Sequence, residues 1–437
     1  MTVKNHDLRA LSALSPTKLE MMRPMKSSKV LALVGALLVI CLAVFFALRR
    51  GPDRSSSSDA PGPRILWSFA SGSDKLSGIA LAPNGAVHFA AADGIYALSP
   101  QGKFLWKTPL PSGPVIAAPA LSPAGTLYAA SQSGKLFALD ASGNLTWQSD
   151  ATQHKFFTPP ALGNDDALYV TDDYTDLFAF APTTGPSLAW KQMTYSPSGS
   201  RDDILLGTNS SPYDPGPGEW RSSPVIGGND TINLAHQQWL YRLNLRGDVM
   251  WFIQLPVGHL GFPAIGRDGI VYISGHNPSW LFAIGPEGQQ RWGLRLSNRL
   301  QGSPVVDTAG VIYFCDSDFV KAVLPDGHSE WNVQAECNSG LALAADGTIY
   351  LSLNSREPGR VTRVPSLAAF TSDGHLKWKL AINGMVRDAP AISTDGAIFF
   401  TTDKGFAYAV SDSASPPMDS PWPRFQHDPQ NSGHSRF

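Results

Sequence analysis

The residues best suited to binding chemistry gather in two stretches rich in aromatic and arginine side chains, residues 194–218 and 354–365. The side chains that we single out in and beside them are Tyr195, Arg201, Tyr213, Trp220, Arg356, Arg360 and Arg363. Aromatic rings anchor interfaces, and the guanidinium fork pairs with carboxylates, phosphates or sugar acids. Both stretches are therefore candidate surfaces for a ligand or partner, with long loops of no function as the equal alternative.

Catalytic and metal-binding patterns are absent from the sequence. The 10 His are scattered without metal-ligand spacing, and His259 with His276 is only a pair. The chain contains no G-x-S-x-G elbow, phosphate loop or H-E-x-x-H. Asp346 and Asp395 each precede a Gly, which is turn chemistry. We therefore predict no catalytic residue and no metal ligand.

The elements that must position these stretches follow from a repeat. Eight Trp recur at intervals of 39–47 residues, apart from one interval of 61. They are Trp67, Trp106, Trp147, Trp190, Trp251, Trp292, Trp331 and Trp378. Most close a phrase such as ALDASGNLTW (138–147), in which a Gly lies four residues before the Trp. A Gly fixed at one offset indicates a tight turn with positive φ.

A second phrase lies upstream of each Trp phrase. In APALSPAGTLYAA (118–130) and APAISTDGAIFFT (389–401), a short apolar run, a turn and a β-rich run follow one another. That order predicts a hairpin. Each period then holds four short strands, the content of a propeller blade. We predict an all-β, eight-bladed β-propeller of four-stranded antiparallel blades, with the Trp side chains as structural wedges between blades.

Composition agrees with such a ring. The 437 residues include 40 Gly and 35 Pro, and only 16% are charged. The net charge of -2 excludes a strongly basic nucleic-acid binder, and 3 Cys exclude a disulfide-dense scaffold. Residues 64–67 match the outer strand that the last unit, 387–411, lacks. We predict that this N-terminal strand completes the eighth blade and that the tail, 422–433, clasps the seam.

The phrases A-x-D-x-x-G-x-x-x-W and S-P-A-I-G-x-D-G-x-I-Y resemble the pyrroloquinoline quinone (PQQ)-like repeat over residues 65–431. That family includes eight-bladed quinoprotein dehydrogenases and outer-membrane barrel-assembly lipoproteins related to BamB. The resemblance implies the fold, and the repeat itself does not bind the quinone. The dehydrogenases carry adjacent cysteines over the quinone and a calcium site. This chain has no Cys-Cys pair and no calcium ligands that we can map, so neither PQQ nor calcium is expected.

Strand order places both insertions on one face. The first joins an outer strand to the next inner strand, and the second joins the second and third strands of a blade. In a four-stranded blade these connections share a face. Cys315 and Cys337 fall on the same face of adjacent blades. A disulfide and two buried free thiols are both open.

The N-terminal region predicts a membrane anchor. Residues 30–48 contain no charge, enough helix to cross about 30 Å of hydrocarbon. A cleaved signal peptide has a shorter apolar region and a small-residue cleavage site. The excess of basic residues favours a cytoplasmic 1–29 segment, and 49–63 reads as a flexible tether. Residues 64–437 would then lie on the periplasmic side of the inner membrane.

Three functions remain open from sequence. The first is a membrane-anchored propeller that binds envelope proteins as a scaffold, without chemistry and without nucleic acid. The second is a PQQ-dependent quinoprotein oxidoreductase. The third is an enzyme acting on polysaccharide, with its site in the central channel. The missing Cys-Cys pair opposes the second, and no motif supports the third.

Overall fold

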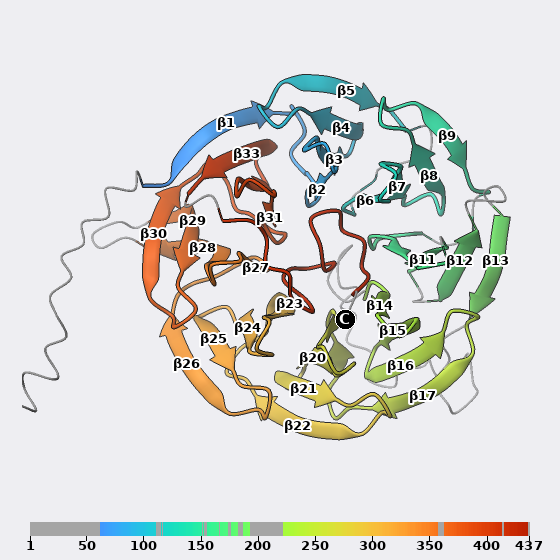
Figure 1. Cartoon of the computed structure of the whole chain (residues 1–437), viewed down its shortest axis with the longest axis vertical. Helices are drawn as coiled ribbons and strands as arrows, with labels where there is room; N and C mark the ends of the chain where they lie inside the picture. The colour runs from blue at the N-terminus through green and yellow to red at the C-terminus, as the bar shows by residue number, and fades with distance from the viewer. Residues whose placement is uncertain are drawn as a thin grey trace, which may run out of the picture. The chain divides into compact units, whose positions relative to one another are not determined.

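The computed structural model describes residues 62–435 apart from 111–114, 116, 151, 153–154, 166, 174–175, 182–186, 193–221, 357–361 and 413–414. Pro61–Phe437 form one compact unit. Its strands make eight separate sheets arranged as a ring (Figure 1). The predicted eight-bladed all-β propeller is therefore confirmed.

Within the described residues, no helix has the length and apolar character needed to cross a membrane. The predicted cytoplasmic segment 1–29 and membrane segment 30–48 lie outside the described residues, as does the tether up to residue 61.

The first four blades are formed by strands consecutive in sequence. Blade 1 contains β2 (Ala80–Leu81), β3 (Val87–Ala91), β4 (Gly94–Leu98) and β5 (Phe104–Thr108). Blade 2 contains β6 (Ala120–Leu121), β7 (Leu127–Ala130), β8 (Leu136–Leu139) and β9 (Leu145–Gln148). Blade 3 contains β10 (Ala161–Leu162), β11 (Leu168–Thr171), β12 (Leu177–Ala181) and β13 (Ser187–Gln192). Blade 4 contains β14 (Val225–Gly227), β15 (Thr231–His236), β16 (Trp239–Asn244) and β17 (Val249–Gln254).

The remaining blades include one irregular sheet and the closing blade. Blade 5 contains β18 (His259–Leu260), β19 (Ala264–Ile265), β20 (Val271–His276), β21 (Trp280–Ile284) and β22 (Gln290–Arg295). Blade 6 contains β23 (Gln301–Val306), β24 (Ile312–Cys315), β25 (Phe319–Val323) and β26 (Ser329–Gln334). Blade 7 contains β27 (Ala342–Leu343), β28 (Ile349–Arg356), β29 (Arg363–Phe370) and β30 (Leu376–Ala381). Blade 8 contains β31 (Ala391–Ile392), β32 (Ile398–Thr401), β33 (Phe406–Ser411) and β1 (Arg64–Ala70).

Blade 5 differs from the predicted four strands. Both β18 and β19 pair with β20, so its inner strand is divided in two. Pro263 lies in the gap, and a proline cannot donate to a strand ladder.

The hydrophobic core is divided among the blade interfaces. Eight clusters of buried residues form, and each draws on at least two neighbouring blades. One blade cannot bury both faces of its sheet, so the stack supplies the core that a single domain would otherwise need.

Outer-strand tryptophans join consecutive blades. Trp292 of blade 5 is typical, since its Nε1 donates to the Pro325 carbonyl of blade 6 at 2.8 Å. A Cβ added to Gly327 in that turn would lie 2.9 Å from the Trp292 ring, and the φ of Gly327 is +92°. The repeated Gly is thus required twice, for its backbone angle and for the neighbour's indole. The equivalent bonds are Trp67 to Pro100, Trp106 to Ala141, Trp190 to Leu245, Trp251 to Pro286 and Trp331 to Ser372.

Each outer strand also carries a β-bulge at the residue before its Trp. In blade 1, Ala97 opposes Trp106 while Leu98 opposes Phe104, which leaves Leu105 unpaired. The register shifts at the same place in all eight blades. A bulge interrupts a strand edge that would otherwise be free to pair with another chain.

The ring closes as the sequence predicts, because β1 pairs antiparallel with β33. The tail contacts the blades on both sides of this seam, and it also extends well beyond the seam that the sequence predicted it to clasp. Residues 415–435 run along the inner strands at the centre of the ring (Figure 1). Backbone amides of six inner strands donate to tail carbonyls at 2.7–2.9 Å. These amides belong to Leu81, Leu121, Leu162, Ile226, Val306 and Leu343.

The tail reaches the other two blades through side chains. Phe425 packs edge-on against Phe262 of blade 5 at 5.0 Å. Arg424 donates to the Ala389 carbonyl at the start of blade 8 at 3.2 Å. All eight blades therefore contact one short segment. Since an inner strand is also a sheet edge, the tail provides the partner that these edges lack.

Candidate functional site

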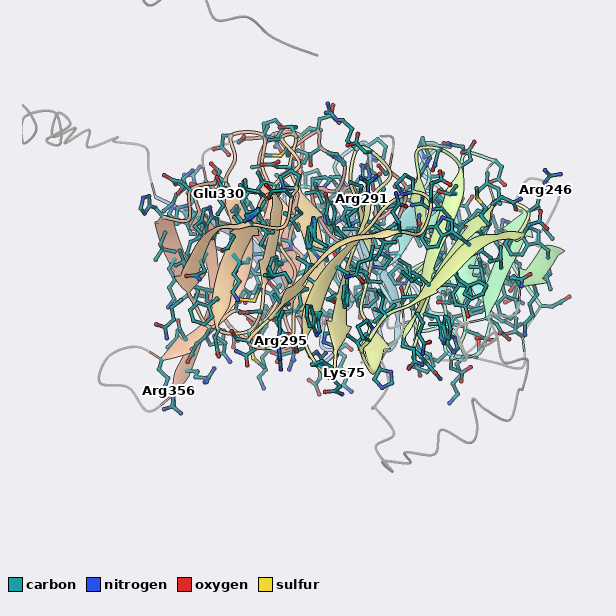
Figure 2. All side chains as sticks on the ribbon, turned by 90° about the horizontal axis from the view of Figure 1, so that it is seen from below. Lys75, Arg246, Arg291, Arg295, Glu330 and Arg356 are labelled. Carbon is teal, nitrogen blue, oxygen red and sulfur yellow. A yellow bond between two sulfur atoms is a disulfide. The ribbon has the colours of Figure 1, made fainter. Side chains whose placement is uncertain are left out.

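The hairpin of β28 and β29 carries the described part of the predicted arginine cluster. Both strands have 8 residues, and Arg356 opposes Arg363 at their far end. Figure 2 shows Arg356 projecting beyond the ring, on the face that also carries Arg295 and Lys75. Arg246 lies toward the opposite face. The predicted insertion therefore forms a basic projection from one face of the propeller.

Arg363 is held by the connection between blades 6 and 7. Its Nη1 lies 3.2 Å from Glu336 Oε2 and donates to the Asn354 carbonyl at 3.1 Å. The two charged side chains are 48% and 37% exposed, so the pair contributes little to stability. Its effect is to orient one guanidinium, while Arg356 at the end of β28 is exposed. An exposed arginine of this kind can pair with a carboxylate or phosphate of another molecule.

The same connection carries the cysteine pair. Cys315 of β24 and Cys337 are joined as a disulfide across blades 6 and 7, with their Cα atoms 6.2 Å apart. Cys337 also forms a β-bridge with Leu353, and the Asn354 amide donates to the Glu336 carbonyl at 2.8 Å. The base of the projecting hairpin is thus tied to the neighbouring blade by covalent and backbone bonds.

The whole of the first predicted cluster lies outside the described residues. These residues are Tyr195, Arg201, Tyr213 and Trp220, and Arg360 of the second cluster joins them. We call the face from which the β28–β29 hairpin projects the hairpin face. The described residues that flank the long insertion lie on this face. Gln192 pairs with Leu177, which follows the connection between β11 and β12, and Thr171 donates to the Ser222 carbonyl at 3.0 Å.

The blade tryptophans are placed between blades. The turn that would meet Trp147 falls outside the described residues, but its ring packs on Tyr128 at 6.1 Å. Trp378 packs on Tyr350 at 5.9 Å, and its Nε1 has no hydrogen-bond partner among the residues described. The blade that follows Trp378 is the closing blade, whose third and fourth strands are not joined by a turn.

A buried arginine in blade 4 replaces an otherwise repeated Ala. Arg242 lies opposite both Asn233 and Trp251, in the place that Ala occupies in other blades. Its guanidinium donates to Asn233 Oδ1 and to the carbonyls of Pro286 and Gly269, each at 2.8 Å. Burial lowers the pKa of Arg242 to about 10, which leaves it charged at neutral pH. Because each of its three nitrogens already donates a hydrogen bond within the protein, this arginine is structural.

The two histidines noted in the sequence face each other in blade 5. His259 and His276 pair across β18 and β20. Burial lowers the pKa of both, that of His276 to about 4, so both rings are neutral at pH 7. Over the described part of the chain, no group of three or more His, Cys, Asp or Glu is placed to hold a metal ion.

The channel contains a buried charge network that sequence reasoning missed. Arg424 Nη1 donates to the Asp428 carbonyl at 2.8 Å and to Asn431 Oδ1 at 2.7 Å. Burial lowers the pKa of Arg424 to about 10 and raises the pKa of Asp388, although Arg424 and Arg387 act against that rise. The network holds the tail in place, since most of its bonds lie within the tail or reach inner-strand backbone.

A pocket of about 590 Å³ lies between blades 8 and 1, on the face opposite the projecting hairpin. Trp67, Phe399 and Asp395 line it together with the turns at Asn84 and Gln101. A pocket between blades 1 and 2 measures only about 190 Å³. The sequence did not reveal the larger pocket because it arises at the junction of the first and last blades.

The fold and its loops define an eight-bladed propeller built from PQQ-like repeats. Residues 56–212 match the family model described as outer membrane protein assembly factor BamB. No curated protein sequence matches the chain significantly.

Solved structures with similar folds cover most of the chain. BamB from Moraxella catarrhalis has a TM-score of 0.62 at 13% identity, covering 80% of this chain and 99% of its own. The β-propeller domain of Cps50 (Swd1) from Myceliophteria thermophila has a TM-score of 0.52 at 11% identity, with coverage of 80% and 99%. At such identities the likeness extends to the fold alone.

Proposed function

We propose that this protein is a membrane-anchored propeller of the cell envelope that binds other envelope proteins as a scaffold and catalyses no reaction. The family description that matches residues 56–212 names an outer membrane protein assembly factor, which supports proteins as partners. The uncharged segment 30–48 supports a single-pass anchor in the inner membrane. The ring then lies on the periplasmic side.

The tail at the ring centre is the observation that carries the proposal. A propeller enzyme with a channel site needs open space along the axis, and the tail fills the centre of this ring (Figure 1). Here residues 415–435 hydrogen-bond to the inner strands and bring Trp422 and Arg424 into buried positions. The proposal accordingly includes no quinone, no calcium and no polysaccharide in the channel, and binding is assigned to the hairpin face.

The disulfide supports a location outside the cytoplasm, where such bonds persist. Mass spectrometry of non-reduced peptides from protein isolated from cells should detect the Cys315–Cys337 link. Two free thiols would contradict the periplasmic assignment of the ring.

In-cell photocrosslinking tests the binding face. A photoreactive residue at Arg356 should capture a reproducible set of envelope proteins, whereas the same residue at Arg246, an exposed arginine toward the opposite face, should not. Equal capture at both positions would contradict a specific face. Failure to capture any protein, together with a quinone-like absorbance of the purified chain, would favour the oxidoreductase.

A further inference from the structure

The outward positions of the eight outer strands can be compared residue by residue. The two residues directly before each Trp, of which the second is the bulged one, are exposed in all eight blades. Because the backbone is the same in every blade, differences in residue type at these positions are not required by the fold. The pairs, from blade 8 through blades 1 to 7, are Ile65-Leu66, Phe104-Leu105, Leu145-Thr146, Leu188-Ala189, Val249-Met250, Gln290-Arg291, Ser329-Glu330 and Leu376-Lys377.

Only blades 8, 1 and 4 carry two large apolar residues, and blades 8 and 1 are neighbours. Ile65 and Leu66 are each 44% exposed, and Phe104 and Leu105 are 47% and 48% exposed. The two strands form one surface, because Phe69 of β1 stacks on Phe104 of β5 at 6.3 Å. We call these residues the β1–β5 edge. Single exposed apolar residues are ordinary, but a contiguous group marks an interaction surface.

The bulges restrict what can cover this edge. Leu66 and Leu105 are the bulged residues of their strands, so neither strand offers an unbroken ladder to an added strand. Pairing with a second copy of the chain, edge to edge, is disfavoured for that reason. A surface that makes apolar contacts without backbone hydrogen bonds fits the β1–β5 edge better.

The lipid bilayer to which the chain would be anchored is such a surface, and the tether limits its distance from β1. The apolar segment 30–48 is joined to β1 by residues 49–63. A tether of this length spans at most roughly 50 Å when fully extended, so β1 stays within that distance of the membrane. Neighbouring β5 is carried with it (Figure 1). Blade 4, with Val249 and Met250, lies across the ring from blade 8 (Figure 1), and a flat bilayer touching one edge cannot reach the other.

We propose that the β1–β5 edge lies against the lipid bilayer, so that the ring stands on its rim at the membrane surface. The proposal rests on the proposed membrane anchoring. Lateral burial of the apolar side chains in the acyl boundary would fix the orientation of the ring and present the hairpin face to partners from the side.

Labels at three equivalent positions test this orientation. The full chain with Cys41→Ser is reconstituted into phosphatidylcholine and phosphatidylglycerol vesicles, and Leu105→Cys, Met250→Cys or Glu330→Cys is labelled with an environment-sensitive fluorophore. Each of these residues directly precedes a blade Trp and is exposed, so the substitutions leave the core intact. Doxyl lipids should quench the label at Leu105 several-fold more than the label at Met250, an apolar control, or at Glu330, a polar control.

Each other outcome is decisive. Equal quenching at positions 105 and 250 would show that apolarity alone controls the signal, and it would overturn the proposal. A blue-shifted but unquenched label at 105 would mean that protein covers the edge, which also overturns it. A quenched label on Cys41 of the unsubstituted chain, together with an unquenched label at 105 in the Leu105→Cys variant, refutes the edge contact alone. An unquenched Cys41 refutes the anchor itself.

Discussion

The closing blade and the seven blades of consecutive strands pack against the Trp of the preceding blade in different ways. In a continuous blade the turn between the third and fourth strands provides a Gly and a carbonyl for the preceding Trp, as Gly327 and Pro325 do for Trp292. Blade 8 takes its fourth strand from the other end of the chain, and Trp378 has no Nε1 partner among the described residues. The Gly–Trp contact is therefore a property of the turn, and the closing blade relies instead on β1 and on the tail.

Among the changes that test this comparison, deletion of residues 420–437 should lower the stability of the protein most. It removes Trp422, which is fully buried and whose loss alone would cost about 3–5 kcal/mol, together with backbone bonds to six inner strands. We expect a strongly lowered thermal midpoint, measured by calorimetry. An unchanged midpoint would mean that strand pairing in the closing blade suffices without the tail.

Substitution of the turn glycine should be the next largest effect. Gly327→Ala places a Cβ 2.9 Å from Trp292 at φ +92°. Gly125→Ala is the matched control, since its φ is +85° and nothing lies within 4 Å. Positive φ alone costs about 1–2 kcal/mol, and the clash adds about 1–3 kcal/mol. In chemical denaturation, the free energy of unfolding of Gly327→Ala should therefore be clearly lower than that of Gly125→Ala. If both variants lost the same stability, the contact with Trp292 would not explain the requirement for Gly.

The ring that packs on the blade Trp is a histidine in blade 1 and a phenylalanine in the closing blade, so the stability of the two contacts should differ in its pH dependence. His88 packs on Trp106 in blade 1, where Phe399 packs on Trp67 in the closing blade. Burial lowers the pKa of His88 from 6.5 to about 4, so between these values the unfolded chain binds more protons. The free energy of unfolding should fall by up to roughly 3 kcal/mol as the pH drops from 6.5 to 4.

His88→Phe should remove that part of the acid sensitivity, as seen in denaturation midpoints across the pH range. An unchanged pH slope would contradict a buried neutral His88. The residual slope should come from His236 and His276, whose pKa values burial also lowers to about 4.

The smallest effect is expected at the indole nitrogens themselves. Trp331→Phe loses the bond from Nε1 to the Ser372 carbonyl at 2.9 Å, whereas Trp378→Phe loses no described hydrogen bond. The two variants lose similar ring area, so their difference should be about 1 kcal/mol. If Trp378→Phe were the more destabilising, the closing blade would depend on its Trp more than the continuous blades do.

The repeated sequence patterns predicted the features of the fold that depend on residues close together in the sequence. The Gly four residues before the Trp, the hairpin phrase and the lone N-terminal strand give eight blades and their closure without any distant information. The route of the tail could not be predicted in this way, because Leu81 and Pro429 meet only once the ring exists.

The candidate site was predicted less completely than the fold. The insertions identified the hairpin face through strand order, and they placed Arg356 and Arg363 together. The support from Glu336 depends on where two blades come to lie, and so does the pocket beside Trp67. Neither leaves a repeated pattern in the sequence. In the sequence, Arg242 stands out only because it replaces the repeated Ala. Its buried role depends on Asn233, which takes the place of the aromatic residue on the neighbouring strand.

The position of the tail has a consequence for the order of biosynthesis. Strand β1, which precedes all other described strands, waits for β33, and the inner strands wait for residues 422–433, which follow every blade in the sequence. A growing chain therefore holds seven complete sheets until β33 is made, and the centre of the ring stays unoccupied until residues 415–435 follow. Completion of the ring becomes a late event, and a chain that stops before residue 415 retains open inner-strand edges that chaperones and proteases can recognise.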